Sequence, residues 1–309
     1  MNSTATTAPQ LCGLLLIDKP AGLTSHSVVA RLRRTLQIDR VGHLGTLDPF
    51  ATGLLPIMIG GATRLADEIM DGDKGYIFDL FLGQETDTLD PSGQTIATAE
   101  VPSQWQENLK SVLPQFTGSI IQVPPAYSAL KMNGKPLYEH MRATGKLPAD
   151  IATKTRNVDI HSIKVEALSS NTATLNVICA KGTYIRSLAR DIAVALGTVG
   201  HCSALRRTLV APWKVENALA FDIDNLNAGV LKSNILPPEA MVPQLPLKDL
   251  PREFTRPLCV GNVFQMERHV WPEAEAGFFL ARIENHLFLS EITIGVAEVL
   301  TVRPRKKIS

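Results

Sequence analysis

The chain carries the stretch VGHLGTLDPFATGLLP at Val41–Pro56, in which the apolar residues recur at neither the helical nor the strand spacing. Its glycines, threonines and Pro49 predict a long ordered loop. Asp48 lies in this loop, which is apolar enough to be partly buried, and a buried carboxylate costs several kcal/mol unless it is paired. Asp48 is then either an Asx-turn or helix cap, as most loop Asp-Pro pairs are, or a catalytic carboxylate held rigidly by the glycines and proline around it.

Strands and helices surround this loop without a regular βαβ rhythm. A helix capped by Thr24 or Ser25 is expected, since the apolar residues Val28, Leu32 and Leu36 follow at intervals of four positions. Further helices are expected at Ala62–Met70, Ser103–Val112 and Gly182–Leu196, and strands at Gly13–Ile17, Tyr76–Leu82, Val158–Val165 and Thr172–Cys179. The pattern predicts an α+β main body with a mixed sheet and flanking helices.

The length of 309 residues predicts two domains, since one domain typically has about 100–200 residues. Prolines cluster at Pro243–Pro251, and we place a boundary near Leu247. Residues 1–12 are expected to be a disordered tail, and residues 13–246 the main domain. Residues 247–309 are expected to be a small β-rich module, with short apolar strands at Gly277–Ile283, His286–Ile292 and Val296–Val302.

The composition indicates the class of protein. Apolar residues make up 45% of the chain and charged residues 20%, which is typical of a globular protein with a full core and excludes a disordered or fibrous chain. The apolar runs fall far short of the roughly 18 residues that a membrane span needs, and the N-terminus lacks the features of a secretory signal. The four cysteines form no CxxC pair and have no histidine at ligand spacing. We therefore expect a reduced, cytoplasmic protein with no membrane contact and no metal site.

The charge of the chain is nearly balanced but unevenly distributed. Its net charge of +1 argues against a DNA-coating protein. Lys181–Lys214 carries six basic residues against one acidic residue, and Arg303–Lys307 is basic apart from one proline. Such segregation is typical of a protein that binds a polyanion, provided that the basic segments share a face. Solvated helix faces and a loose tail are the alternative.

Four blocks of the chain resemble the bacterial tRNA pseudouridine-55 synthase family, TruB. They are GLLLIDKPAGLTS, GHLGTLDPFATGLLPI, PPAYSALKMNGKPLYE and KGTYIRSLARD, which occur in this order between Gly13 and Asp191, and Leu205–Arg207 extends the match. The combination is specific, although no single block would be. The resemblance implies a mixed, largely antiparallel sheet with an active-site cleft, followed by a small PUA-like β-barrel that contacts RNA. The C-terminal part matches only in its size and β content.

The resemblance implies that Asp48 is the catalytic nucleophile. Pseudouridine formation detaches uracil from C1′ of the ribose and reattaches it through C5, so a group must carry the intermediate and a base must take the C5 proton. A carboxylate can form such a covalent link, by attack at C1′ or C6. Arg186 matches the arginine that pairs with this aspartate and keeps it ionised; without the resemblance it would be taken as an exposed arginine. No cofactor is implied, since nothing is oxidised and no group is transferred.

The resemblance also assigns residues around the target base. Tyr76 matches the tyrosine that stacks on the flipped uracil. Without the resemblance, Tyr76 would be interpreted as an aromatic residue of the core or of a cross-strand pair. Tyr184 and Leu205 match positions of the pocket wall, although both are ordinary core residues by periodicity. His43 matches a histidine that contacts the T loop and helps to hold the base out. Lys19 is expected to brace the active-site loop rather than to act as a base.

We therefore expect a tRNA pseudouridine synthase that isomerises uridine 55, acting as a monomer on the tRNA T-arm with no guide RNA and no obligatory protein partner. Leu44 departs from the family, which commonly has a polar residue after the histidine, and should alter loop packing rather than chemistry. Two other functions stay open at this point. One is an RNA-binding module that folds tRNA without chemistry, which would not need Asp48, Tyr76 and Arg186 together. The other is a guide-RNA-dependent synthase subunit, which would need partner-binding extensions that we do not identify.

Overall fold

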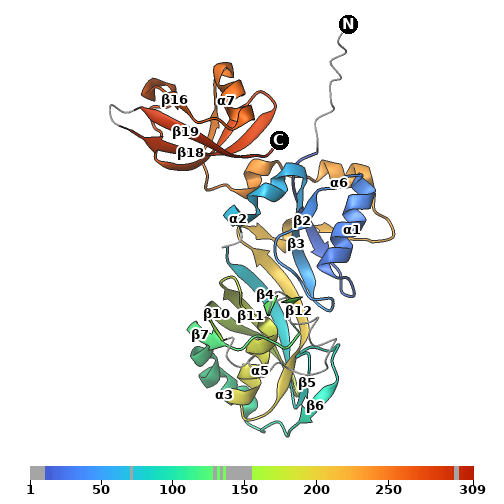
Figure 1. Cartoon of the computed structure of the whole chain (residues 1–309). Coiled ribbons are helices and arrows are strands. Elements are labelled where there is room, and N and C mark those ends of the chain that lie inside the picture. Colours follow the sequence, from blue (N-terminus) through green and yellow to red (C-terminus); the bar gives the residue numbers. More distant parts are fainter. Residues whose placement is uncertain (1–10, 70–71, 128–130, 133–134, 137–154, 296–298) are drawn as a thin grey trace.

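The computed structural model describes residues 11–69, 72–127, 131–132, 135–136, 155–295 and 299–309. Two bodies are visible, a main body around one large sheet and a smaller C-terminal sheet beside one end of it (Figure 1). Most of the expected disordered tail, at residues 1–10, lies outside the described residues. Within the described ranges, no helix is long and apolar enough to cross a membrane.

The described helices are short, and most of the regular structure is strand. The helices are α1 (Ser25–Leu36), α2 (Ala66–Ile69), α3 (Trp105–Val112), α5 (Ile185–Ala195), α6 (Ala228–Ser233) and α7 (Thr255–Val260). The strands are β1 (Gly13–Lys19), β2 (Val41–His43), β3 (Thr52–Ile59), β4 (Lys74–Leu82), β5 (Gln84–Thr86), β6 (Thr95–Thr98), β7 (Gly118–Gln122), β8 (Lys131–Met132), β9 (Lys135–Pro136), β10 (Arg156–Leu168), β11 (Thr172–Cys179), β12 (Gly200–Val210), β13 (Trp213–Lys214), β14 (Leu219–Ala220), β15 (Leu247–Asp249), β16 (Phe264–Met266), β17 (Gly277–Ile283), β18 (His286–Ile294) and β19 (Leu300–Lys307).

The main sheet has the strand order β14-β1-β3-β12-β4-β11-β10-β7, with β2 added to β3 and β13 to β12. The pairs β1–β14 and β3–β12 are parallel, and the other pairs are antiparallel. This confirms the expected α+β body with a mixed, largely antiparallel sheet. Because β12 lies between β3 and β4, it contacts both the strand that follows the Asp48 loop and the strand that carries Tyr76.

Helix α1 forms where its cap and apolar stripe predict it. The side chain of Thr24 accepts a hydrogen bond from the backbone N–H of Ser27 at 2.9 Å, which satisfies one of the free donors of the first turn. The apolar stripe of the helix is buried in the main core. This packing fixes the buried Ser25, in the first turn, beside the loop that carries Asp48.

Three predicted elements differ from the structure. The expected loop at Val41–Pro56 contains β2 and the start of β3, so only residues 44–51 form a loop; β3 is buried on both faces, which hides its strand period. The helix expected at Ala62–Met70 is a 3-10 turn, η1 (Gly60–Leu65), followed by the single turn α2. The strand expected at Val296–Val302 runs instead from Leu300 to Lys307, and residues 296–298 lie outside the described range. From Arg303 to Lys307 exposed and less exposed side chains alternate, so this part has the period of a strand without the apolar residues by which a strand was expected.

The C-terminal module is a five-stranded sheet in the order β15-β17-β18-β19-β16. The described strands leave β15 and β16 as free edges, each three residues long and paired with one neighbour, so the expected closed barrel is not observed. One face of the sheet has its own apolar cluster, which includes Phe279, Phe288 and Val302. The other face contributes Leu280 and Leu289 to a cluster shared with the main body. Buried apolar contact therefore joins the two bodies.

Candidate active site

The Ser25 hydroxyl holds the peptide that precedes Asp48. It accepts a hydrogen bond from the Leu47 N–H at 2.8 Å and donates one to the Leu47 carbonyl at 3.1 Å. Ser25 is itself buried in the first turn of α1. The residue before Asp48 is therefore fixed to a helix that is anchored in the core.

Lys19 holds the other side of the same loop. Its ammonium group donates to the carbonyls of Pro20 and Leu23, each at 2.8 Å, and to that of Pro49 at 3.4 Å. Burial lowers the pKa of Lys19 to about 8, although the nearby Asp48 carboxylate opposes this change. All three acceptors are backbone atoms, and one of them, the Pro49 carbonyl, directly follows Asp48 in the loop.

Arg186, in the first turn of α5, joins Asp48 to a second carboxylate. Its Nε lies 2.9 Å from Oδ2 of Asp48, and its Nη1 lies 3.3 Å from Oδ2 of Asp90. The same guanidinium donates to the backbone carbonyls of Thr88 and Tyr127, both at 2.8 Å. The Arg186 side chain is 5% exposed, whereas that of Asp48 is 33% exposed. A buried cation thus holds Asp48 while part of its carboxylate stays accessible to solvent.

The protonation of Asp48 reflects these neighbours. Burial raises the pKa of Asp48, because it penalises the charged form; Arg186 opposes the rise and Asp90 adds to it. Asp48 therefore takes up a proton at a higher pH than an exposed aspartate does. Arg186 is the largest influence that keeps the carboxylate ionised.

Tyr76 and Leu205 lie on neighbouring strands and on the same face of the sheet. Leu205 of β12 pairs with Phe78 of β4, and Tyr76 is two residues away along β4. Both side chains are mostly buried. Burial raises the pKa of Tyr76, the guanidinium of Arg207 opposes this rise, and the charge of Asp48 adds a smaller increase. The Tyr76 phenol is thus within electrostatic reach of the carboxylate.

Tyr184 is the residue before α5, two residues from Arg186. Its N–H donates to the side-chain oxygen of Gln122 at 2.8 Å, and its carbonyl accepts from the same amide at 3.0 Å. The guanidinium of Arg156 lies 4.9 Å from the centre of its ring. Among the described residues, no hydrogen bond or ring contact joins Tyr184 to Tyr76.

His43 is the last residue of β2 and is half-buried. Its Nδ1 is buried and has no hydrogen-bond partner in the described part of the chain. Burial lowers the pKa of His43, and the nearby Arg207 and His26 lower it further. The imidazole is therefore neutral at neutral pH and has an unused ring nitrogen.

Two polar residues at the site, Asp90 and Arg207, were missed by the sequence analysis. Asp90 begins the turn Asp90-Pro91-Ser92-Gly93, and its Oδ1 accepts from the Ser92 N–H at 2.9 Å, as turn aspartates do. Arg207 is 1% exposed, although it follows another arginine in a strand. No local signal distinguishes either residue, because both owe their position to contacts with distant segments.

The arrangement determines which chemistry the site can perform. It offers a partly exposed carboxylate, a buried arginine that holds it, and a buried tyrosine whose pKa the carboxylate influences. Among the residues that the structure describes, no three His, Cys, Asp or Glu side chains are grouped to hold a metal ion. The carboxylate can form a covalent intermediate, and the tyrosine can take part in proton transfer or stacking.

Comparison with known proteins identifies the family. Residues 33–185 match the family model described as TruB family pseudouridylate synthase (N terminal domain). The chain is 46% identical over 217 residues to tRNA pseudouridine synthase B of Francisella philomiragia, across 70% of each chain. The chain belongs to the TruB family of pseudouridylate synthases. It is also 44% identical over 233 residues to tRNA pseudouridine synthase B of Bordetella avium, across 74% of this chain and 94% of that one. This confirms the expected class, an isomerase that acts on tRNA.

The likeness to solved structures includes the C-terminal sheet of this TruB chain. A chain in the crystal structure of a Cbf5-Nop10-Gar1 complex has a TM-score of 0.66 and 25% identity, and the match covers 97% of this chain and 85% of that one. A chain in the structure of an H/ACA RNP bound to a substrate RNA containing 2′-deoxyuridine has a TM-score of 0.65 and 22% identity, and the match covers 100% and 93%. The fold is thus shared over nearly the whole length.

Proposed function

We propose that this TruB chain isomerises uridine 55 in the T loop of tRNA, with Asp48 as the nucleophile and no cofactor. The observation that carries the proposal is the contact between Asp48 and Arg186, in which a partly exposed carboxylate is held 2.9 Å from a buried guanidinium. An ionised aspartate with access from solvent can attack a bound uridine. The bonds of Ser25 and Lys19 support the same role, because they fix the backbone on both sides of Asp48.

In the proposed reaction, uracil leaves C1′ of the ribose, turns and bonds again through C5. The Asp48 carboxylate forms a covalent link to the nucleoside, at C1′ or C6. A link at C1′ breaks as C5 bonds to C1′, with the carboxylate as the leaving group, whereas a link at C6 breaks by elimination after C5 has bonded. C5 loses its proton and N1 gains one, so the product is an isomer of the substrate. The phenol of Tyr76 assists the removal of the C5 proton, directly or through a water molecule.

The proposed pocket holds a uridine that has been pulled out of the T loop. A flipped base must replace its lost stacking, and the Tyr76 ring supplies an aromatic surface for it. Leu205 and Tyr184 form apolar walls, and Lys19 braces the loop below. His43, which is half-buried at the end of β2, contacts the T loop with the part of its imidazole that stays exposed.

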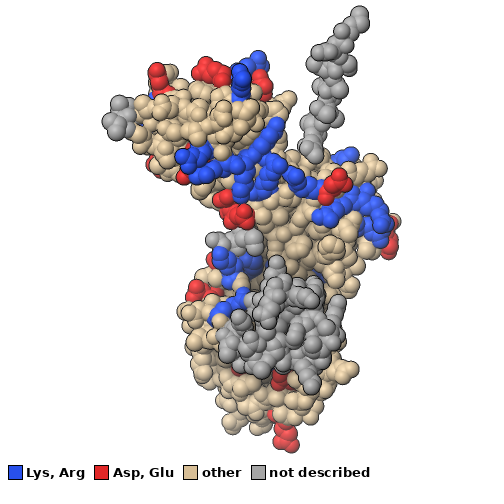
Figure 2. Space-filling view, viewed as in Figure 1, with Lys and Arg blue, Asp and Glu red and all other residues tan. Residues whose placement is uncertain are grey.

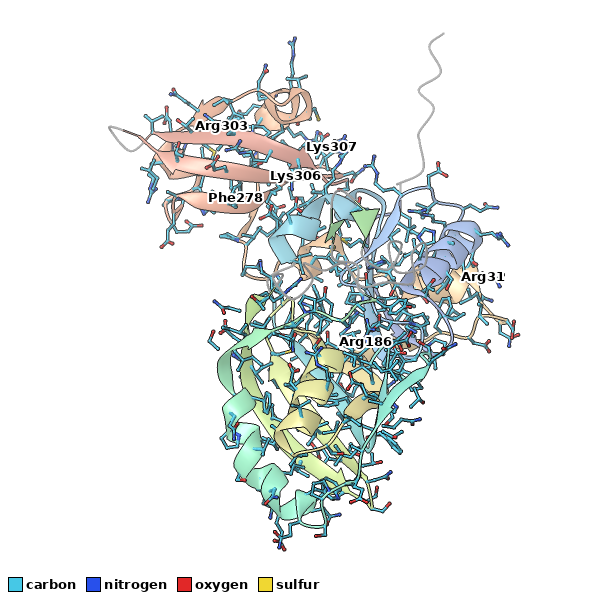
Figure 3. All side chains as sticks on the ribbon, turned by 60° about the horizontal axis from the view of Figure 1, so that its bottom comes forward. Arg31, Arg186, Phe278, Arg303, Lys306 and Lys307 are labelled. Atoms are coloured by element: carbon cyan, nitrogen blue, oxygen red, sulfur yellow. The ribbon has the colours of Figure 1, made fainter. Side chains whose placement is uncertain are left out.

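We also propose that residues 13–246 are the catalytic domain and that residues 247–309 are an RNA-binding domain with a PUA-like role. Lys and Arg side chains form a band from the C-terminal sheet onto the main body (Figure 2). We call Arg64 of η1 and Arg303, Arg305, Lys306 and Lys307 of β19 the basic band. The ammonium of Lys306 donates to the Arg64 carbonyl at 3.0 Å, which joins the two parts. Arg303, Lys306 and Lys307 lie apart from Arg186 (Figure 3), which supports contact with RNA phosphates outside the target loop.

The proposed enzyme acts alone, as a monomer, without a guide RNA. The relatives at 44% and 46% identity are named tRNA pseudouridine synthase B, whereas the structural neighbours at lower identity come from complexes with further components. A module that only binds RNA is disfavoured, because binding does not require a buried arginine aligned with a partly exposed carboxylate.

The test uses an unmodified tRNA transcript and the purified protein, with no other macromolecule. Pseudouridine is mapped by carbodiimide treatment and primer extension. The proposal expects one strong stop at the T-loop uridine. A protein that binds the transcript tightly but leaves every uridine unmodified, or that modifies only another position, contradicts it.

A further inference from the structure

Arg207 is the largest fully buried side chain of the described residues, and the reaction proposed above does not use it. Its Nε donates to the Leu54 carbonyl at 2.7 Å. Its two terminal nitrogens reach the carbonyls of Gly45 at 3.1 Å and Thr46 at 3.4 Å. Thus Arg207 bonds to backbone on both sides of the loop that carries Asp48.

No carboxylate among the described residues pairs with Arg207. In contrast, Arg186 pairs with two carboxylates, and Arg206, its neighbour on the opposite face of β12, pairs with Asp18 at 2.7 Å. A guanidinium stays charged at every pH that a protein encounters, and a buried charge without a counter-charge is costly. The backbone carbonyls of Leu54, Thr46 and Gly45 therefore stabilise this cation.

The strand pairing places Arg207 between the two proposed catalytic elements. In the register of the sheet, Arg207 of β12 lies opposite Gly53 of β3, just after the loop. On its other side it lies opposite Tyr76 of β4. The approach of β12 to β3 requires glycine at position 53, since a Cβ atom there would lie 2.2 Å from the Arg207 carbonyl oxygen. The guanidinium also opposes the rise in the pKa of Tyr76 and lowers the pKa of His43. The Arg207 side chain thus bonds to the Asp48 loop and also influences the Tyr76 phenol.

We propose that Arg207 is a positioning residue for pseudouridine formation, which fixes the Asp48 loop and the Tyr76 phenol in one geometry from beneath the site. The proposal rests on the roles given above to Asp48 and Tyr76. At 1% exposure Arg207 does not reach the RNA, so it acts through these two residues. Its loss should slow the chemical step and leave tRNA binding unchanged.

The first test compares Arg207→Lys with Arg206→Lys. Lysine keeps the charge, but it lacks the separate Nε and Nη donors with which the planar guanidinium holds the Leu54 and Gly45 carbonyls in a fixed geometry. We expect the single-turnover rate of Arg207→Lys at saturating enzyme to fall by about a hundredfold, as small misplacements of catalytic groups cause, with the tRNA Kd within about threefold. Arg206→Lys should change both quantities by less than about threefold.

The second test changes Gly45, a loop residue whose carbonyl accepts a hydrogen bond from Arg207, and leaves Arg207 itself in place. It therefore does not depend on the folding of an Arg207 variant. A Cβ atom at Gly45 would lie 3.4 Å from Arg207 Nη1 and 3.9 Å from Lys74 Cε, and no Tyr76 atom lies within 4 Å of it. Alanine is strained at the Gly45 φ of +83°, so Gly45→Ala should move the loop together with the Arg207 guanidinium that is bonded to the Gly45 carbonyl, and through Arg207 also Tyr76. Gly261→Ala is the matched control, because Gly261 has a similar positive φ, +77° against +83°, and no neighbour within 4 Å.

The readout is the ¹⁹F spectrum of protein labelled with 3-fluorotyrosine. The chain has four tyrosines, and Tyr76→Phe identifies the resonance of Tyr76. We expect Arg207→Lys and Gly45→Ala to shift this resonance, and Arg206→Lys and Gly261→Ala to leave it in place. An unshifted Tyr76 resonance in Gly45→Ala overturns the proposal, as does an Arg207→Lys enzyme with the normal rate, or one whose rate and affinity fall together. An active Asp48→Asn enzyme, measured in parallel, would instead refute the function proposed for the site.

Discussion

The Arg186 guanidinium contacts the Asp48 carboxylate along its Nε edge, at 2.9 Å, while its Nη1 lies 3.3 Å from Asp90. One buried cation therefore serves two carboxylates, and only one of these is exposed enough to meet a substrate. This geometry makes Arg186 a control on the ionisation of Asp48 as well as on its position. Both effects can be measured separately.

Replacing Arg186 should move the acid limb of the pH profile. Arg186 lowers the Asp48 pKa against the effect of burial, so Arg186→Met raises that pKa further. The proposed reaction needs the ionised Asp48 carboxylate, and its rate is therefore expected to rise as the pH increases through this pKa. We expect the acid limb of the single-turnover rate to shift to higher pH in Arg186→Met, with part of the lost activity regained on raising the pH.

The matched control is Arg190→Met, one turn further along α5, because Arg190 bonds to Asp191 and not to Asp48. Its profile should match that of the unmodified protein. An acid limb that stays in place or moves to lower pH in Arg186→Met would show that Arg186 does not govern Asp48.

Ser25→Ala tests the brace on the Asp48 loop. The change leaves a buried N–H and a buried carbonyl of Leu47 without the Ser25 partner, which costs about 1–3 kcal/mol of unfolding free energy. We also expect a loss of at least about tenfold in the single-turnover rate, because the loop is less well fixed. Urea unfolding and rate measurements check both effects. Ser27→Ala, which removes only a bond to the Thr24 carbonyl, should change stability by less than about 0.5 kcal/mol, and equal effects of the two changes would refute the brace.

Gly53→Ala tests the close approach of β12 to β3. A methyl group at this position would overlap the Arg207 backbone, and the φ of +102° is itself unfavourable for alanine. We expect a loss of about 2 kcal/mol or more in the free energy of unfolding. Gly118→Ala has a similar φ of +89° with open space around it, so it measures the strain alone. A loss no greater than that of Gly118→Ala would contradict the steric account.

Local signals were sufficient for part of the fold. Helix α1 could be predicted because Thr24 caps it and an apolar stripe runs along it. Strand β12 could not, although it lies near the centre of the sheet. Register shifts between Cys202 and Ala204 and between Arg207 and Leu209 interrupt its regular alternation. A central strand with two irregularities lacks the period-two pattern by which strands are recognised.

The candidate site was predictable only in part for a related reason. Asp48 is conspicuous in its own loop, since glycines and a proline surround it. Arg186 would be taken as a surface residue by its place in the sequence, and the family resemblance alone pointed to its partner. Asp90 and Arg207 gain their positions from tertiary contacts with segments far away in the sequence, and such burial of charge leaves no periodic signal.

Removing two charges from the basic band should weaken tRNA binding without slowing the chemistry. Arg303 and Lys307 are exposed on β19, and the shared apolar cluster does not include them. If each contacts one phosphate, Arg303→Gln/Lys307→Gln lowers the slope of log K against log salt by about 2, at roughly 0.9 for each contact on a duplex. Filter binding over a salt series checks this. Lys110→Ala/Arg252→Ala, which removes exposed charges elsewhere, should keep the slope, and an unchanged slope in the band variant would contradict the proposed RNA contact.

The most direct measurement of the central claim is single-turnover pseudouridine formation by Asp48→Asn on an unmodified tRNA transcript at saturating enzyme. Asparagine preserves the size of the side chain but is not a carboxylate nucleophile. The nucleophilic role of Asp48 predicts no product at the T-loop uridine above the background without enzyme, with a tRNA Kd within about tenfold of that of the unmodified protein. Product formation by pure Asp48→Asn at a rate near that of the unmodified protein would contradict it.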